Sequence, residues 1–229
     1  MKIYCIDYGT TFCGIAVTDE KLKIALPKDT VRSEELTEYL ESLNLNNGSI
    51  LVFGLPISLS GRYSHQTFLT IETALRIKNK TGCQIFLVDE RLTTSSLYNE
   101  LKGNVPFKKI KKVKDQNSSV LILNTFLENP QIAVELREKP IYKIECDLSI
   151  YNNILIVDVP ISNILEKTKN ENLTLFTQDP WIFWFYYKQG LKSTSLTSDL
   201  QNDYELIISL KENEKKIRTL FPLSKLMCL

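Results

Sequence analysis

Three acidic residues lie where predicted strands end or a predicted helix begins, and carboxylates at such positions suit metal chemistry. Asp7 closes the first strand in IDYGTT, Glu90 follows an apolar strand in VDERLTT, and Asp115 begins a late helix in KVKDQNSSVLIL. Carboxylate oxygens are the ligands that hard divalent cations such as Mg²⁺ prefer. Two such ions about 3.5–4 Å apart activate water and stabilise the leaving oxygen in phosphodiester hydrolysis. Acids at strand ends also serve as helix caps and turn residues, so the spacing alone leaves both roles open.

The elements that would position these acids form a β-meander followed by alternating helices and strands. Residues 2–7 and 12–18 are β-prone runs on either side of a turn and predict a hairpin, with a third strand expected near 21–25. Ser33 is expected to cap the first helix. Further strands are expected at 50–54 and 84–88, and further helices at 64–80, 94–101 and about 115–128. This order predicts an α/β fold with a mixed sheet.

A lysine-rich stretch, residues 102–114, comes directly before Asp115. Gly103, Asn104 and Pro106 predict that it forms a flexible loop. Its cations are Lys102, Lys108, Lys109, Lys111, Lys112 and Lys114. Such a run either grips a phosphate backbone, with an affinity that falls as salt rises, or is simply a solvated loop.

Two arginines are further candidates for contacts with a nucleic acid. Arg62 lies in the loop 55–63 that follows the buried-type strand SILVF, where it would line one wall of a cleft. Arg91 adjoins Glu90 and serves either as a phosphate clamp or as a structural partner of a nearby carboxylate. The residue types alone leave both roles open for Arg91.

Composition narrows the class of protein. The chain has 229 residues, with 28 Lys and Arg against 27 Asp and Glu, so any nucleic-acid binding must come from a local basic patch. No apolar run approaches the roughly 18 residues of a membrane helix. Asp7 comes too early for the apolar core of a secretory signal. The five cysteines are odd in number and form no CxxC pair, which favours reduced thiols and a cytoplasmic location.

The charged run before Pro140 suggests a boundary, giving domains over 1–138 and 139–229. The second is expected to be a smaller α/β domain. Its expected strands are 153–159, 172–176 and 204–209, and its expected helices 161–168, 180–190 and 211–221. Trp181, Trp184 and Phe185 fall at helical spacing and are expected to form the main buried stripe, against the second sheet, the first domain or another subunit. This aromatic segment is therefore also a candidate for oligomer contacts.

Four motifs resemble those of the YqgF/RuvX family of ribonuclease-H-like proteins. They are IDYGTTFCGIAVTD, VFGLPISLSG, VDERLTT and KVKDQNSSVLILNTFL, and they span roughly residues 1–130 in the order and spacing of that family. The resemblance implies a five-stranded mixed sheet of order 3-2-1-4-5 with helices on both faces. It also implies a nuclease dependent on Mg²⁺ or Mn²⁺, with Asp7, Glu90 and Asp115 as catalytic metal ligands. The substrate it implies is RNA, in 5′-end maturation of pre-16S rRNA; relatives that resolve Holliday junctions make branched DNA the alternative substrate.

The chain departs from the family pattern at two places near these acids. Thr11-Phe12-Cys13 stands where the family has a basic residue, as in DYGTKRIG, and Ser118-Ser119 replaces paired alanines. The missing cation keeps a non-catalytic, ribosome-associated RNA-binding protein as an alternative function. A third class is an actin-like ATP-binding protein, whose phosphate loop also reads Asp-x-Gly-Thr-Thr but which needs two such domains.

Overall fold

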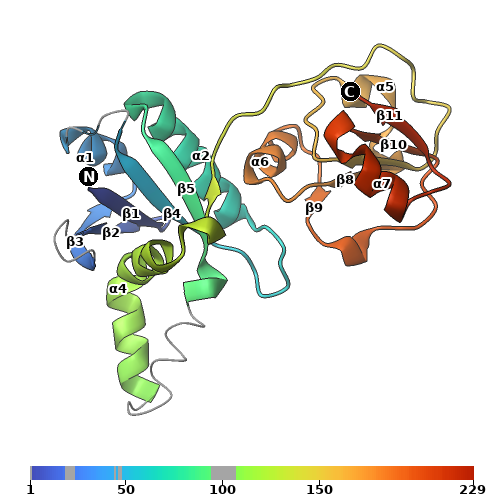
Figure 1. Ribbon diagram of the computed structural model, residues 1–229. Helices are drawn as coiled ribbons and strands as arrows, with labels where there is room; N and C mark the ends of the chain where they lie inside the picture. The colour runs from blue at the N-terminus through green and yellow to red at the C-terminus, as the bar shows by residue number, and fades with distance from the viewer. Residues whose placement is uncertain (1, 19–23, 44, 46–47, 94–106) are drawn as a thin grey trace. The chain divides into compact units, whose positions relative to one another are not determined.

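The computed structural model folds into two compact units, Met1–Leu136 and Arg137–Leu229 (Figure 1). The structure describes residues 2–18, 24–43, 45, 48–93 and 107–229, and the side chains of 107–117 lie outside that description. Within the described residues, no helix is both long enough and apolar enough to cross a membrane. Each unit has its own sheet.

The first unit is built on a six-stranded mixed sheet of order β3-β2-β1-β4-β5-β6. The strands are β1 (Ile3–Tyr8), β2 (Phe12–Thr18), β3 (Ala25–Arg32), β4 (Ile50–Leu55), β5 (Gln84–Asp89) and β6 (Val134–Glu135). The first three are antiparallel neighbours, whereas β4 and β5 run parallel to β1. The expected order 3-2-1-4-5 is therefore confirmed, and β6 adds a short antiparallel edge that the sequence did not predict.

The third strand was predicted too early, near 21–25. It runs over Ala25–Arg32 and is largely exposed, because it is the edge strand of the sheet. Pro27 and the charged residues after it disguise the strand in the sequence, although an edge strand tolerates both. The predicted capping role of Ser33 is also wrong. Helix α1 (Leu36–Ser42) begins after Glu35, and the Ser33 hydroxyl instead donates to the Gly9 carbonyl oxygen at 2.6 Å.

Helices cover both faces of the first sheet, with α2 (His65–Thr81) and α4 (Phe107–Glu128) on opposite sides (Figure 1). Side chains alternate between the two faces along each strand. The face under α4 carries Cys5, Ala16, Val52 and Val88, which pack with Ile122, Leu123 and Phe126 of the helix. Asp7 follows Cys5 by two residues on β1 and so belongs to the α4 face. Glu90 lies beyond the end of β5, but its carboxylate shares the space over Gly54 with Ile122 of α4 and is therefore on the same face.

Helix α4 begins at Phe107, which corrects the prediction of a loop over the whole of 102–114. Lysine is a good helix former, and Phe107, Ile110 and Val113 continue an apolar pattern at a spacing of three residues. Five of the predicted lysines therefore lie on the first two turns of the helix; Lys102 lies outside the described residues. Helix α2 matches its prediction, with a capping box at Ser64 and a left-handed Gly82 (φ 68°) at its end.

The second unit contains a five-stranded sheet, of order β11-β10-β7-β8-β9, in which every pairing is parallel. Its strands are β7 (Ile154–Val157), β8 (Leu173–Phe176), β9 (Ser193–Thr194), β10 (Leu206–Ser209) and β11 (Lys225–Cys228), and its α-helices are α5 (Ile164–Lys167), α6 (Pro180–Lys188) and α7 (Glu214–Leu220). Counted along the unit, the order is 3-2-1-4-5, that of a doubly wound α/β unit. The predicted second α/β domain is confirmed. The edge strands β9 and β11 were not predicted; they are only two and four residues long.

The aromatic helix α6 is buried along a stripe different from the one predicted. Trp181, Ile182, Phe183 and Tyr186 are buried, whereas Trp184 and Phe185 are half-buried. The Tyr186 hydroxyl donates to the Val159 carbonyl oxygen at 2.6 Å and accepts from the Ile161 amide at 3.1 Å. These two bonds tie α6 to the loop after β7, and helical spacing alone could not reveal them.

Candidate active site

Asp7 and Glu90 lie at one edge of the first sheet. Asp7 is near the end of β1, and Glu90 is the first residue after β5, in a helical segment over residues 90–93. Both strands flank β4 and run parallel to it, so their carboxyl ends meet at the same edge. The structure therefore brings two of the three predicted acids to one edge and one face of the sheet.

Two glycines make room for these carboxylates. A Cβ on Gly54, in the strand between the two acids, would lie 2.7 Å from Oε1 of Glu90 and 2.6 Å from Cδ1 of Ile122. Gly14 pairs with Asp7 across β1 and β2, and a Cβ there would lie 3.4 Å from Oγ of Ser119. Because neither glycine carries a side chain, Glu90 rests over β4 and α4 approaches the sheet beside Asp7.

Burial and mutual repulsion dominate the electrostatics of the two acids. Burial, followed by repulsion from Asp7 and Asp89, raises the pKa of Glu90 to about 7. Burial also raises the pKa of Asp7, and a hydrogen bond from the Ser118 side chain opposes that rise. Among the described side chains, neither carboxylate has an ion-pair partner. Two half-buried carboxylates that repel each other fit a divalent cation, which would relieve that repulsion.

Asp115 lies on α4, but its side chain is outside the described residues. The helix register nevertheless relates its position to the site. Ser118, Ser119 and Ile122 contact the site, and Asp115 precedes them by three, four and seven residues, the spacing of one helix face. Among described side chains no group of three metal-ligating residues occurs, so the third ligand of the predicted site remains a prediction.

The predicted nucleic-acid contacts have different surroundings. The Arg91 guanidinium forms a two-point ion pair with Asp89, with an N–O distance of 2.6 Å, which is the structural role that the sequence left open. Arg62 lies in a tight turn closed by a bridge between Ile57 and Tyr63, at the carboxyl end of β4 and hence at the edge that carries the acids. Contacts from Lys108, Lys109, Lys111 and Lys112 are untested, because these side chains are not described.

Sequence reasoning missed two residues that hold the site together. Ser118 was noted only as a departure from paired alanines, yet its side chain hydrogen-bonds Asp7. Gln66, in the first turn of α2, donates from Nε2 to the Tyr8 carbonyl oxygen at 2.8 Å and so secures the residue after Asp7. The departure at Ser118 was the one available signal, because a hydroxyl in place of a methyl group adds a donor.

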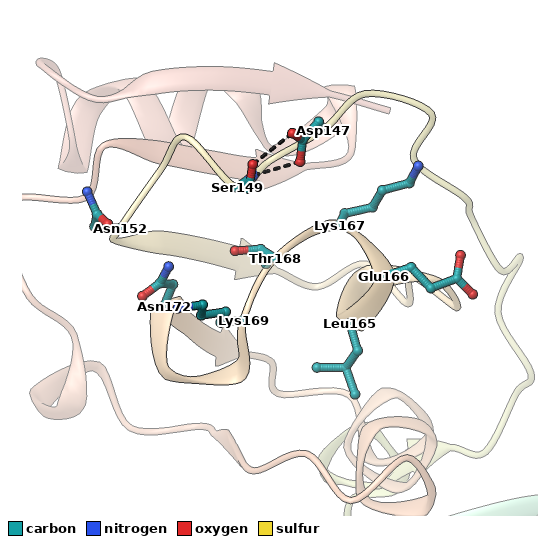
Figure 2. A pocket seen from close by; sticks show the side chains of 9 residues that line it. All are labelled: Asp147, Ser149, Asn152, Leu165, Glu166, Lys167, Thr168, Lys169 and Asn172. Carbon is teal, nitrogen blue, oxygen red and sulfur yellow. Dashed lines mark hydrogen bonds between the residues drawn. The ribbon is translucent and has the colours of Figure 1, made fainter.

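The second unit has a polar pocket of about 330 Å³ at the amino-terminal ends of β7 and β8 (Figure 2). Its lining consists of Asp147, Ser149, Asn152, Leu165, Glu166, Lys167, Thr168, Lys169 and Asn172. Ser149 donates to Asp147 from its amide at 2.9 Å and from its hydroxyl at 2.7 Å, and these bonds lower the pKa of Asp147. The pocket lies away from the carboxyl edge where doubly wound units bind ligands, and hydrogen bonds from Ser149 already stabilise Asp147 as the anion.

The mixed sheet, the antiparallel hairpin at its start and the acids at its carboxyl edge define the first unit as a ribonuclease-H-like domain. The model of the RuvX family, described as Holliday junction resolvase, matches residues 1–129, more than half of the chain. The protein belongs to the RuvX family, which is a family of nucleases.

Relatives named as candidate pre-16S rRNA nucleases match either one unit or both. A protein of Thermotoga maritima is 28% identical over 99% of this chain and 94% of its own length. Relatives from Maridesulfovibrio salexigens (33% identical) and Rickettsia typhi (32%) match 56% and 55% of this chain, and 98% and 81% of their own lengths. The alignment with the Thermotoga protein therefore extends across the second unit.

Among solved structures, RuvC of Thermus thermophilus is similar over 59% of this chain and 100% of its own, with 12% identity and a TM-score of 0.37. A likeness of that degree carries no functional argument.

Proposed function

We propose that this protein is a divalent-metal-dependent nuclease that hydrolyses phosphodiester bonds in RNA, in 5′-end maturation of pre-16S rRNA. The observation that carries the proposal is the pair Asp7 and Glu90, two carboxylates at one sheet edge that have no ion-pair partner among the described side chains. Family membership supports hydrolysis of a nucleic acid. The names of the relatives support pre-16S rRNA as the substrate.

Asp7, Glu90 and Asp115 would hold the metal ions, Mg²⁺ or Mn²⁺. When bound, such ions supply an activated water and neutralise the charge on the departing oxygen. The residues of the chain prepare the site for them. Ser118 orients the Asp7 carboxylate and favours its ionised form, and Gly54 leaves the space in which Glu90 lies beside Ile122. The proton that Glu90 holds near neutral pH has to leave before a cation binds.

The alternative of an actin-like ATP-binding protein loses support from the second unit. That class needs a second domain with its own antiparallel phosphate hairpin, whereas every strand pairing described in the second unit is parallel. A resolvase acting on branched DNA keeps specific support, because the matching family model carries that description.

A cleavage assay on two substrates tests the proposal. The wild-type protein is incubated with RNA that spans the 5′ precursor end of 16S rRNA and with four-way DNA junctions, in Mg²⁺, Mn²⁺ or a chelator. We expect metal-dependent cleavage of the RNA, and a loss of at least about 100-fold in Asp115→Asn, because each ligand contributes to metal affinity. Asp29→Asn, an exposed acid of β3, is the matched control and should cleave normally. Cleavage of junctions alone would establish the resolvase instead, and metal-dependent binding without cleavage would favour the non-catalytic RNA-binding protein.

A further inference from the structure

Phe12 is an aromatic residue that the fold leaves in water beside the candidate active site. Its side chain is 54% exposed, and of the Phe and Tyr side chains described in the first unit it alone is exposed. Burying a ring of this size contributes favourably to folding, so a ring left in solvent gives up that contribution. Packing within this unit therefore does not explain Phe12.

The register of the sheet places Phe12 on the same face as the acids. Asp7 pairs with Gly14 of β2, and Phe12 precedes Gly14 by two residues. Residues two apart on a strand share a face and lie about 7 Å from each other. β2 begins beside the carboxyl end of β1. Phe12 therefore lies at the same end of the sheet as Asp7, two residues beyond the Asp7–Gly14 pair.

The backbone at Phe12 is held in place from both neighbouring strands. The Gly9 amide donates to the Phe12 carbonyl oxygen at 3.1 Å, and the Ser33 amide donates to the Thr11 carbonyl oxygen at 3.0 Å. The Ser33 hydroxyl also bonds Gly9, so the hairpin tip is fastened to the segment after β3. A ring on a fixed frame binds a flat partner with little further loss of conformational entropy.

A cation adjoins this ring. Arg32 of β3 is the cross-strand partner of Phe12, and cross-strand partners in an antiparallel pair share a face. Its ion pair with Glu34 spans 3.5 Å between two largely exposed side chains, which contributes little and exchanges readily. An exposed aromatic ring next to a cation is the combination that binds single-stranded nucleic acids, the ring stacking on a base and the cation neutralising the backbone.

We infer that Phe12 is a base-stacking residue and that the site takes RNA whose nucleotide next to the scissile phosphate is unpaired. This inference rests on the proposed nuclease function and specifies its substrate class as single-stranded RNA. A base held in a duplex has both faces stacked already, so only an unpaired base can offer a face to Phe12. The stacking site takes the place of the basic residue expected in this hairpin.

Binding measured without cleavage tests the inference. Fluorescence anisotropy in a chelator compares wild type, Phe12→Ala and Phe12→Trp on a labelled single-stranded RNA and on a matched strand without bases. We expect Phe12→Ala to weaken binding about 5- to 100-fold on the normal strand and hardly at all on the abasic strand, with Phe12→Trp close to wild type. The salt dependence of RNA binding by Phe12→Ala should match that of wild type, because stacking releases no counterions.

Two further variants separate stacking from charge and from general surface effects. Arg32→Ala should weaken binding to both strands and reduce the slope of log K against log salt by about 0.7. Leu26→Ala, at a residue of β3 that is 41% exposed, should bind both strands as wild type does. Thermal unfolding of Phe12→Ala should be unchanged, because the ring is not part of the core.

Equal binding of the normal strand by Phe12→Ala and wild type, equal losses on both strands, or no binding of RNA by wild type would each overturn the inference. Tighter, Phe12-dependent binding of single-stranded DNA would overturn RNA as the substrate class. Cleavage by wild type with unchanged binding by Phe12→Ala would refute the stacking role and leave the nuclease standing. If binding depends on Phe12 but the protein cleaves neither substrate, the stacking role stands and the nuclease function is refuted.

Discussion

Both units carry acids at the carboxyl ends of their strands, but in the first unit Glu90 has neither a hydrogen bond nor an ion pair to its carboxylate among the described side chains. In the second unit, Asp158 accepts from the Gln178 amide at 3.3 Å. Asp179 caps α6 through the amides of Trp181 and Ile182 and pairs with Lys139 at 2.9 Å. Strand-end position is therefore a poor guide to a site, because hydrogen bonds and cations within the fold can satisfy an acid completely.

The same contrast appears at the backbone. Asp158 has a φ of 50°, the one non-glycine residue with a positive φ among those described, at the end of the central strand β7. Its amide donates to the Phe176 carbonyl oxygen at 3.0 Å, and its carboxylate accepts from the Gln178 amide in the segment after β8. A conformation that costs roughly 1 kcal/mol is thus offset by local hydrogen bonds. In the first unit the unfavourable feature is electrostatic, and the hydrogen bond from Ser118 to Asp7 offsets it only in part.

The largest expected difference between the units comes from replacing one strand-end acid in each of them by asparagine. Asp7→Asn should lower metal-dependent cleavage by at least about 1000-fold, because it removes a charged ligand from the site. Asp158→Asn should cleave normally, since asparagine keeps the acceptor and tolerates a positive φ. Single-turnover cleavage rates would measure both effects. A comparable loss in the two variants would refute the distinction between the units.

The charge pair should also affect stability in a pH-dependent way. Glu90 has a folded pKa of about 7 against an ordinary value of 4.5, so the folded state binds its proton more tightly. Its favourable contribution is present below pH 4.5 and is lost as the pH rises through 7. Without divalent ions, the free energy of unfolding of Glu90→Gln should therefore rise by up to about 3 kcal/mol relative to that of wild type as the pH increases from 4.5 to 8.

Denaturant unfolding at the two pH values checks this prediction, and Glu166→Gln in the second unit is the control, expected to change by less than about 0.5 kcal/mol. Added Mn²⁺ should stabilise wild type at pH 8 and stabilise Glu90→Gln less. A Glu90→Gln protein whose stability relative to wild type does not vary with pH would show that neither burial nor repulsion raises the pKa of Glu90 in the folded state.

In the second unit, the buried Tyr186 hydroxyl makes two hydrogen bonds to the backbone. Tyr186→Phe leaves the Ile161 amide and the Val159 carbonyl oxygen without this partner and should cost about 2 kcal/mol. Tyr187→Phe, whose ring is exposed, is the control. We expect cleavage by Tyr186→Phe to remain normal under native conditions. Chemical denaturation followed by tryptophan fluorescence measures the loss, since both tryptophans lie in α6.

A further prediction concerns the lysines of α4. Replacing Lys108, Lys109, Lys111 and Lys112 by alanine should reduce the slope of log K against log salt for single-stranded RNA by up to about 3, if each neutralises one phosphate. The helix should persist, because alanine is a better helix former than lysine. A slope equal to that of wild type would mean that these lysines only solvate the helix.

Local patterns in the sequence predicted most of the first unit. Alternating and continuous apolar runs located β1, β2, β4 and β5, and the helix expected over 64–80 corresponds to α2. Prediction failed where the tertiary context decides the element. The edge position of β3 permits Pro27, the lysines before Asp115 continue a helix, and α6 buries Tyr186 because of bonds to a distant loop.

Asp7 and Glu90 could be found in the sequence alone, because both the end of an apolar strand and an acid are local features. Their environment could not be found in this way. The hydrogen bond from Ser118 joins residues more than a hundred positions apart, and the space over Gly54 exists only because β4, β5 and α4 meet there. Likewise, Phe12 is one apolar residue among many in the sequence, and only the pairing of β2 with both neighbours places it on the acidic face, exposed to water. Residue type and strand ends are properties of short segments, whereas burial, charge repulsion and exposure arise from contacts between segments.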